Sequence, residues 1–150
     1  MSRWQPFVTV ASVVERAGCF LMVEEAPRGS RTTLFNQPAG HLEPDERIKE
    51  AALRELREET AWQVALTDYL GLYVYTAANG KTFHSHGFSG MALAHLGTPL
   101  DPAILAVHWL TLDEIEVLEH QGRLRSPLVL RRIRDARAER FFSMDSLHEP

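Results

Sequence analysis

GHLEPDERIKEAALRELREETAW, residues 40–62, carries a helical pattern that constrains the interpretation of the whole chain. At 3.6 residues per turn, one side of a helix over this segment carries Ile48, Ala51, Ala52, Glu55, Glu58 and Glu59. The apolar members indicate that this side faces the core, yet three carboxylates share it. An unpaired carboxylate taken out of water costs several kcal/mol, and crowded carboxylates also repel one another. We therefore expect a bound cation among them.

Oxygen ligands without a nearby cysteine suit a hard ion, so we expect Mg²⁺, with Mn²⁺ as a substitute. A loosely held Mg²⁺ keeps water ligands that the phosphates of a substrate can displace. The competing interpretation is a solvated helix held by spaced ion pairs, such as Glu50 with Arg54 and Arg54 with Glu58. For the helix taken alone the solvated interpretation is the better one, and the wider segment reverses that preference.

That wider segment resembles the Nudix box, whose pattern is Gly, five residues, Glu, seven residues and then Arg-Glu-aliphatic-any-Glu-Glu-any-Gly-aliphatic. The matching positions are Gly40, Glu46, Arg54, Glu55, Leu56, Glu58 and Glu59. Two positions depart from the pattern, because Ala61 stands where the family has Gly and Trp62 where it has an aliphatic residue. Both lie at the end of the predicted helix, where Gly normally supplies a left-handed cap. Every carboxylate of the box is retained.

The resemblance implies hydrolysis of a pyrophosphate linkage, in which positioning and charge neutralisation supply most of the acceleration. The expected metal ligands are Glu55, Glu58, Glu59 and, implied by the family alone, the carbonyl of Gly40. We expect Arg54 to orient these side chains or to pair with Glu46, and both join the three helix carboxylates as candidate catalytic residues. The alternative for Arg54 is an ordinary surface salt bridge.

Strands and helices alternate along the sequence. The pattern predicts strands at 7–15, 19–25, 32–35, 65–75, 81–95 and 107–110, with helices at 44–60, 113–119 and 126–137. Pro44, Asp113 and the pair Ser126-Pro127 are the expected helix start signals. Helices packed around a mixed β-sheet make an α/β sandwich, and the resemblance implies the same Nudix-type α/β/α fold.

Length and composition agree with one domain over residues 1–150, of which 45% are hydrophobic. The net charge of −4 implies no broad basic surface, so long nucleic acid is not expected as a partner. Cys19 is the single cysteine, which excludes an internal disulfide and is compatible with a reducing compartment. No apolar run approaches 18 residues and the start of the chain has no signal-peptide pattern. We expect a cytoplasmic protein without a membrane segment, as a monomer or small homo-oligomer.

The general base is either a box glutamate or a residue of a loop outside the box. Asp101 is the candidate outside it, although Asp before Pro is also a common turn former. His84 and His86 alternate with Phe88 on one predicted strand and are candidates for substrate contact. The alternative for both histidines is the wet face of that strand.

Further substrate candidates are Arg28 and Arg31, which flank a turn, and Phe35, which could stack on a pyrimidine ring. Packing in the core is the alternative for Phe35, and a solvated turn for the two arginines. The last predicted helix carries arginines that we interpret as a solvated basic end: Arg131, Arg132, Arg134, Arg137 and Arg140.

Three functions are compatible with these observations. The first is a Mg²⁺-dependent hydrolase of small phosphorylated metabolites, and several segments outside the box resemble one phosphatase branch of the superfamily. Among these segments are residues 7–11, 36–43 and 124–129, and the branch is described as hydrolysing nucleoside tri- and diphosphates and hydroxymethylpyrimidine pyrophosphate. The second is an enzyme that sanitises oxidised nucleotides or cleaves RNA ends. The third is a nucleotide-sensing domain without turnover, which the retained carboxylates disfavour.

Overall fold

Two long N-terminal strands are built from apolar and β-branched residues, which suit a pleated, buried surface. The computed structural model describes residues 2–150, and its first strands are β1 (Phe7–Arg16) and β2 (Cys19–Glu25). They are joined by a tight turn in which Ala17 and Gly18 both have positive φ. The middle residues of both strands are fully buried, so these strands form the centre of the core.

The remaining elements follow the predicted order with shifted boundaries. They are β3 (Leu34–Asn36), β4 (Ala39–His41), α1 (Ile48–Thr60), β5 (Trp62–Thr76), β6 (Thr82–His95), β7 (Ile104–Thr111), α2 (Leu112–His120), α3 (Leu128–Arg137) and the short 3₁₀ helix η1 (Met144–Ser146). The short strand β4 and the helix η1 were not predicted. The helix α1 begins at Ile48 rather than near Pro44, because Asp45 adopts a left-handed conformation that a helix excludes.

The start of α2 corrects one prediction. Thr111, and not Asp113, caps this helix: its hydroxyl accepts a hydrogen bond from the Glu114 amide at 3.2 Å. The Glu114 carboxylate in turn accepts from the Thr111 amide at 3.0 Å. This reciprocal arrangement is the capping box that Thr-x-x-Glu predicts.

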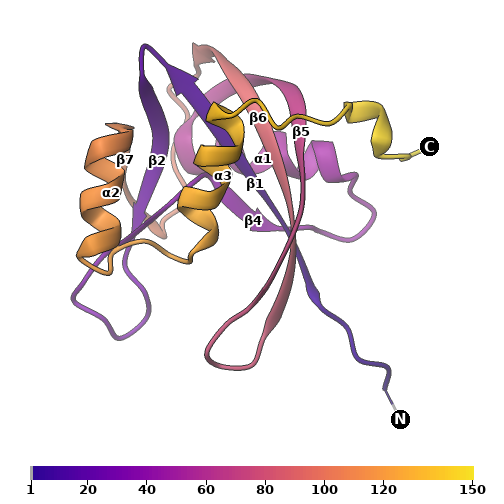
Figure 1. The fold of residues 1–150 in the computed structure, drawn as a ribbon, viewed down its shortest axis with the longest axis horizontal. Helices are drawn as coiled ribbons and strands as arrows, with labels where there is room; N and C mark the ends of the chain where they lie inside the picture. The colour runs from indigo at the N-terminus through magenta and orange to yellow at the C-terminus, as the bar shows by residue number, and fades with distance from the viewer. Residues whose placement is uncertain (1) are drawn as a thin grey trace.

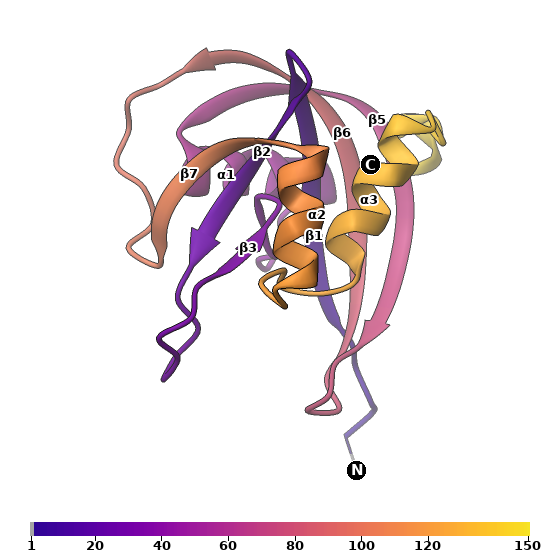
Figure 2. The ribbon, with the colours of Figure 1, turned by 60° about the vertical axis from the view of Figure 1, so that its left-hand side comes forward.

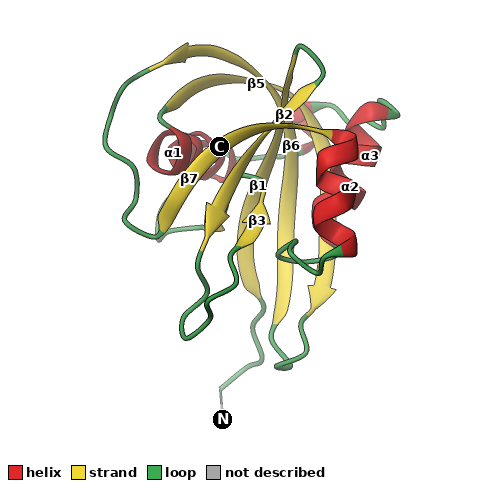
Figure 3. Cartoon of the chain, turned by 90° about the vertical axis from the view of Figure 1, so that its left-hand side faces the viewer, coloured by secondary structure: helices red, strands yellow, loops and turns green. Residues whose placement is uncertain are grey.

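The sheet is mixed and is covered on both sides, as expected for an α/β/α sandwich. Its strands follow the order β3-β2-β1-β6-β5, with β4 paired to β1 and β7 paired to β2. The β1–β6 pair is parallel and the other pairs are antiparallel. Figure 3 shows α1 on one side of the sheet and α2 with α3 on the other, and Figures 1 and 2 show the same layers from two further directions.

Two groups of buried side chains correspond to the two faces of the sheet. Ala51, Ala52 and Leu56 of α1 pack against one face, and Ile115 of α2 and Ile133 of α3 pack within the core of the other. None of the helices in residues 2–150 combines the length and the apolar character that crossing a membrane requires.

Strand β1 pairs with different strands along its length, and this change of partner leaves room for a site. Near its end it pairs with β2 at Glu15 and Arg16, whereas earlier, at residues 9–11, it pairs with β4. The strands β1 and β2 therefore separate toward the start of β1. The short strand β4 lies at this separation and brings Gly40 to the end of α1.

The C-terminal segment contacts two distant parts of the fold. Tyr69 and Phe142 exchange backbone hydrogen bonds of 3.1 and 2.7 Å, which places this segment along the free edge of β5 (Figure 1). Farther along, a carboxylate oxygen of Glu149 accepts a hydrogen bond of 2.5 Å from the amide of Ile48, the first residue of α1. The residue before the helix, Arg47, makes no side-chain cap, so Glu149 serves in its place.

Candidate active site

The carboxylate of Glu55 lies directly over the backbone of Gly40. Gly40 pairs with Val10 of β1, and a Cβ atom added to Gly40 would lie 2.2 Å from the Glu55 carboxyl carbon. No other residue therefore fits at position 40 while Glu55 keeps this position. The glycine permits this close approach, and its φ does not lie in the left-handed region.

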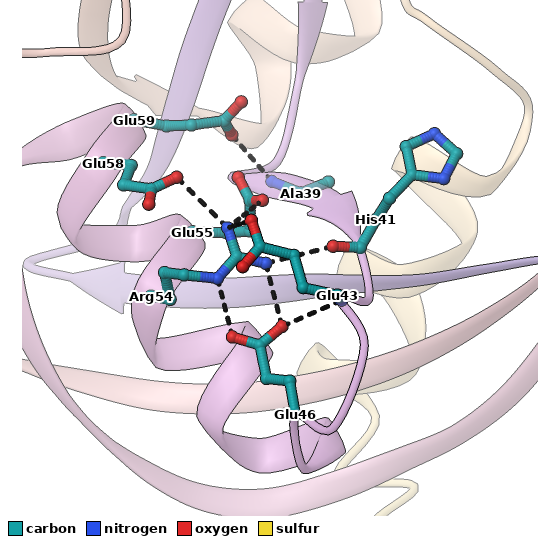
Figure 4. A network of polar contacts seen from close by, with 8 residues as sticks. All are labelled: Ala39, His41, Glu43, Glu46, Arg54, Glu55, Glu58 and Glu59. Atoms are coloured by element: carbon teal, nitrogen blue, oxygen red, sulfur yellow. Dashed lines mark hydrogen bonds and ion pairs between the residues drawn. The ribbon is translucent and has the colours of Figure 1, made fainter.

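Glu59 is held one helical turn farther along α1 and is only 8% exposed. One of its carboxylate oxygens accepts a hydrogen bond of 2.8 Å from the amide of Ala39 in β4 (Figure 4). Burial raises the pKa of Glu59 to about 8, and the nearby charges of Glu55, Glu25 and Asp101 act in the same direction. This carboxyl group therefore lies in an environment that lacks positive charge.

Arg54 is the organising residue of the helix carboxylates. Its guanidinium donates two hydrogen bonds to Glu46, at 2.6 and 3.0 Å, one to Glu55 at 2.8 Å and one to Glu58 at 3.1 Å. A further bond of 3.0 Å goes to the carbonyl of His41 (Figure 4). The structure thus places Arg54 in both of the arrangements considered from the sequence, pairing with Glu46 and orienting box glutamates.

The charges in this network shift in the directions that the contacts require. Hydrogen bonds from Arg54 lower the pKa of Glu46, and those bonds hold the pKa of Arg54 above its usual range. Burial raises the pKa of Glu55 despite its bond to Arg54. Glu58 differs from its neighbours, because 48% of its side chain is exposed. The predicted buried side of the helix is therefore correct for Glu55 and Glu59 and wrong for Glu58.

These residues line a cleft of about 670 Å³. Of the residues predicted from the sequence, its walls include Gly40, Arg54, Glu55, Glu58, Glu59 and Asp101. Glu46 is not in the wall and contacts it through Arg54. The amide of Asp101 donates a hydrogen bond of 2.8 Å to the carbonyl of Glu58, which fixes the loop before β7 against the end of α1.

The donor set of this cleft fits a divalent metal ion. Two buried carboxyl groups with raised pKa values, the exposed carboxylate of Glu58 and a closely approached backbone at Gly40 supply hard oxygen ligands. Within residues 2–150, no three His, Cys, Asp or Glu side chains are gathered in a metal-binding arrangement. In the structure, the three carboxylates are instead hydrogen-bonded within the protein: Glu55 and Glu58 accept from Arg54, and Glu59 accepts from the amide of Ala39. The ligand set stays a prediction that the chemistry of the donors supports.

The other substrate candidates lie apart from this cleft. Arg28 and Arg31 are exposed in the turn before β3, and Phe35 is buried in the core beside His108. His86 contacts the hydroxyl of Tyr69 at 2.9 Å, and His84 lies beside an N-terminal tryptophan ring, Trp4. The structure does not bring these five candidates together with the carboxylates.

One cleft residue was misinterpreted from the sequence. Arg132 of α3 is only 5% exposed, whereas we expected a solvated arginine. It donates hydrogen bonds to the Gln37 side-chain oxygen at 3.1 Å and to the Ser85 hydroxyl at 2.8 Å, and it lines the cleft. A signal was available, because Arg132 stands three residues after Val129 and four before Ala136, on the apolar side of the helix. Arg131, Arg134, Arg137 and Arg140 are exposed as expected.

Known proteins with similar sequences and structures can now be compared with this arrangement. The NUDIX domain family matches residues 5–133. Phosphatase NudJ from Escherichia coli (strain K12) is 39% identical over 133 residues, which cover 87% of this chain and 83% of that protein. A NUDIX hydrolase from Nitrosomonas europaea is 39% identical, with a TM-score of 0.92 over 97% of this chain and 98% of the other. The MutT protein from Methanosarcina mazei Go1 is 26% identical, with a TM-score of 0.70 over 92% and 99% of the two chains.

Proposed function

The chain belongs to the NUDIX domain family, and from this premise we propose that it is a Mg²⁺-dependent hydrolase of small pyrophosphates. Its likeness to Nudix hydrolases and to phosphatase NudJ makes it an enzyme acting on phosphoric anhydrides. The observation that carries the proposal is the pair of buried carboxyl groups, Glu55 and Glu59, packed against Gly40 and Ala39 in an open cleft.

The proposed substrates are nucleoside tri- and diphosphates or hydroxymethylpyrimidine pyrophosphate. The support for this choice is the resemblance to the NudJ branch along most of the chain. The dimensions of the cleft agree, since about 670 Å³ accommodates a small metabolite.

The ion would be held by Glu55, Glu58, Glu59 and the carbonyl of Gly40. Bound there, it would neutralise phosphate charge and make a nearby water easier to deprotonate. Arg54 fixes the rotamers of Glu55 and Glu58 before substrate arrives, so little reorganisation remains for the reaction itself. Glu46 completes this support by holding the other side of the guanidinium.

The candidates for the general base are the box glutamates and Asp101; Glu55, Glu58, Glu59 and Asp101 line the same cleft, whereas Glu46 does not. A base must lie within hydrogen-bond reach of the proton that it removes. Glu59 lines the cleft beside other carboxyl groups, and burial raises its pKa in the metal-free protein, as is typical of acid–base residues. Asp101 is fixed by its own backbone and by an Asx turn to Ala103 at 2.9 Å. We favour Glu59 for proton removal and assign Asp101 to shaping the loop.

The decisive experiment measures Mg²⁺-dependent phosphate or pyrophosphate release from a panel of these substrates. Glu59→Gln is expected to lower kcat at least a hundredfold, because it removes a ligand and the proposed base in one change. Glu50→Gln is the matched control, since Glu50 is exposed on the opposite side of α1 and should leave the rate unchanged. Nucleotide binding without metal-dependent turnover by the wild type would refute the proposal and establish a sensor domain instead.

A further inference from the structure

Arg132 carries a positive charge that the protein does not neutralise. None of the ion pairs within residues 2–150 includes Arg132, although Arg131 beside it pairs with Asp135 at 3.1 Å. Its Nε atom has no hydrogen-bond partner among the described residues and is fully buried. Burial lowers the pKa of Arg132 to about 10. An arginine in this position stays charged at neutral pH, and an unpaired buried charge is costly.

The contacts of Arg132 use only part of its donor capacity. A guanidinium has five N–H groups, and two of them are engaged, by Gln37 and Ser85. The side-chain oxygen of Gln37 accepts from Arg132, and its amide nitrogen donates to the carbonyl of Val129 at 2.7 Å, which fixes the orientation of the amide. The hydroxyl of Ser85 accepts from Arg132, which leaves its own proton free to donate. The cluster therefore offers a ligand a positive charge, the unengaged N–H groups of the guanidinium and the hydroxyl proton of Ser85.

Neighbouring groups do not supply the missing negative charge. The ring of Tyr73 lies 5.6 Å from the guanidinium carbon, which gives a cation–π contact of modest strength. The Tyr73 hydroxyl donates instead to Asp135 at 2.7 Å. Asp135 is itself engaged by Arg131 and Arg140. Arg132 therefore links α3 to the sheet through Ser85, while its charge has no counter-ion among the described residues.

The cluster lies in the same cleft as the helix carboxylates but at a distance from them. Ser85 pairs with Thr9 of β1, and Thr9 pairs with His41, the neighbour of Gly40. Two strand spacings separate these positions, roughly 10 Å. Beside the cluster, Tyr75 and Phe83 face each other across β5 and β6 and line the cleft. Aromatic side chains beside hydrogen-bond donors are typical of a site for a heteroaromatic ring.

We propose that Arg132 and Ser85 form a second substrate subsite, which binds an acceptor oxygen on the part of the substrate that is not hydrolysed. The inference rests on the proposed function, because the scissile phosphates are placed at Glu55 and Glu59. A cationic subsite with several N–H donors favours an oxo group over an amino group at the ring position where guanine differs from adenine and uracil differs from cytosine, since an amino group there would set donor against donor. It would therefore favour GTP over ATP and UTP over CTP. Hydroxymethylpyrimidine pyrophosphate, whose ring carries an amino group and no oxo group, would be a poorer substrate than UTP.

The test compares KM, kcat and calorimetric binding for GTP, ATP, UTP, CTP and inorganic triphosphate. Arg132→Met is expected to raise KM and Kd for GTP and UTP at least tenfold with kcat within threefold, and to abolish the preference over ATP and CTP. Ser85→Ala should give a smaller loss in the same direction, and Arg132→Lys should restore affinity only in part because it loses the planar fork. Arg134→Met is the matched control, because Arg134 is exposed on the same helix and should change nothing.

Each outcome is informative. An equal loss for all nucleotides and for inorganic triphosphate would overturn the contact with the ring and assign Arg132 to the phosphates or to the shape of the cleft. Unchanged KM and Kd in a folded Arg132→Met would overturn the subsite and leave Arg132 as a structural link. If Arg132→Met does not fold, Ser85→Ala decides in the same way. Absence of turnover by the wild type would count against the proposed function alone, since calorimetric binding still reports on Arg132.

Discussion

At the scale of single residues, burial makes ionisation of the Glu55 and Glu59 carboxyl groups unfavourable. Glu59 has a pKa of about 8 in the folded, metal-free protein and about 4.5 in the unfolded chain. Between these values the folded state binds the proton and the unfolded state has lost it. The free energy of unfolding that Glu59 contributes is therefore fully present below pH 4.5 and is lost as the pH rises to about 8.

We expect metal-free wild type to lose stability from pH 5 to pH 8 by on the order of 2 kcal/mol more than Glu59→Gln, whose amide cannot ionise. Denaturant midpoints across this range, measured in chelator, check the difference. Glu50→Gln serves as the control and should follow the wild type. Parallel curves for wild type and Glu59→Gln would show that Glu59 is ionised in the metal-free protein.

Ala61 takes the left-handed conformation that the family pattern assigns to glycine, with φ 60° and ψ 22°. This conformation costs an L-residue about 1–2 kcal/mol, while a buried methyl group is worth about 0.8 kcal/mol. Ala61→Gly should therefore be neutral or stabilising by up to about 1 kcal/mol. Ala51→Gly, at an equally buried site inside α1, should cost about 2 kcal/mol. Thermal unfolding of both variants checks this contrast, and equal destabilisation would contradict it.

The candidate site carboxylates and Arg54 could be predicted from the sequence, because the box pattern places them at fixed intervals. The roles of Arg132 and Ser85 could not, because these residues meet only after α3 packs on β6. Contacts between residues 47 positions apart carry no local signal in one sequence. The exposure of Glu58 was missed for a related reason, since the arc of a helix that a sheet covers depends on the packing angle.

At the scale of elements, the start of α1 depends on the C-terminal segment. The amide of Ile48 donates to Glu149, and a negative charge at a helix N-terminus is also favoured by the helix dipole. We expect Glu149→Ala to lower stability by about 1 kcal/mol and to speed hydrogen exchange at the amide of Ile48. Asp145→Ala, which removes an exposed acidic residue of the same segment, should do neither. Unchanged exchange at Ile48 in Glu149→Ala would exclude this capping role.

Element type was predicted well and element ends less well. The alternation of apolar residues located the long strands, and Pro127 marked the start of α3. The strand β4 was missed because its three residues, Ala39–His41, include a glycine and show no pattern of their own. The register shifts between β5 and β6 were not predicted either, because each depends on its partner strand.

At the scale of the whole molecule, metal binding and folding should be linked. An ion that binds only the folded state stabilises it by about 2.7 kcal/mol at a hundredfold excess over Kd. For a protein of this length we expect Mg²⁺ to raise Tm by roughly 5–10 °C at that excess. Glu59→Gln should show less than half of this shift, whereas Arg134→Met should show all of it. Calcium and sodium controls at equal ionic strength separate specific binding from screening.

The order in which the chain is synthesised determines when α1 gains its cap. The Glu149 cap follows Ile48 by 101 residues, so a ribosome completes α1 long before its cap emerges. At about 5–20 residues per second, the delay is roughly 5–20 seconds. During that interval the free edge of β5 also lacks its cover from Phe142. The nascent chain therefore passes through a stage at which α1 has been synthesised but does not yet have its cap.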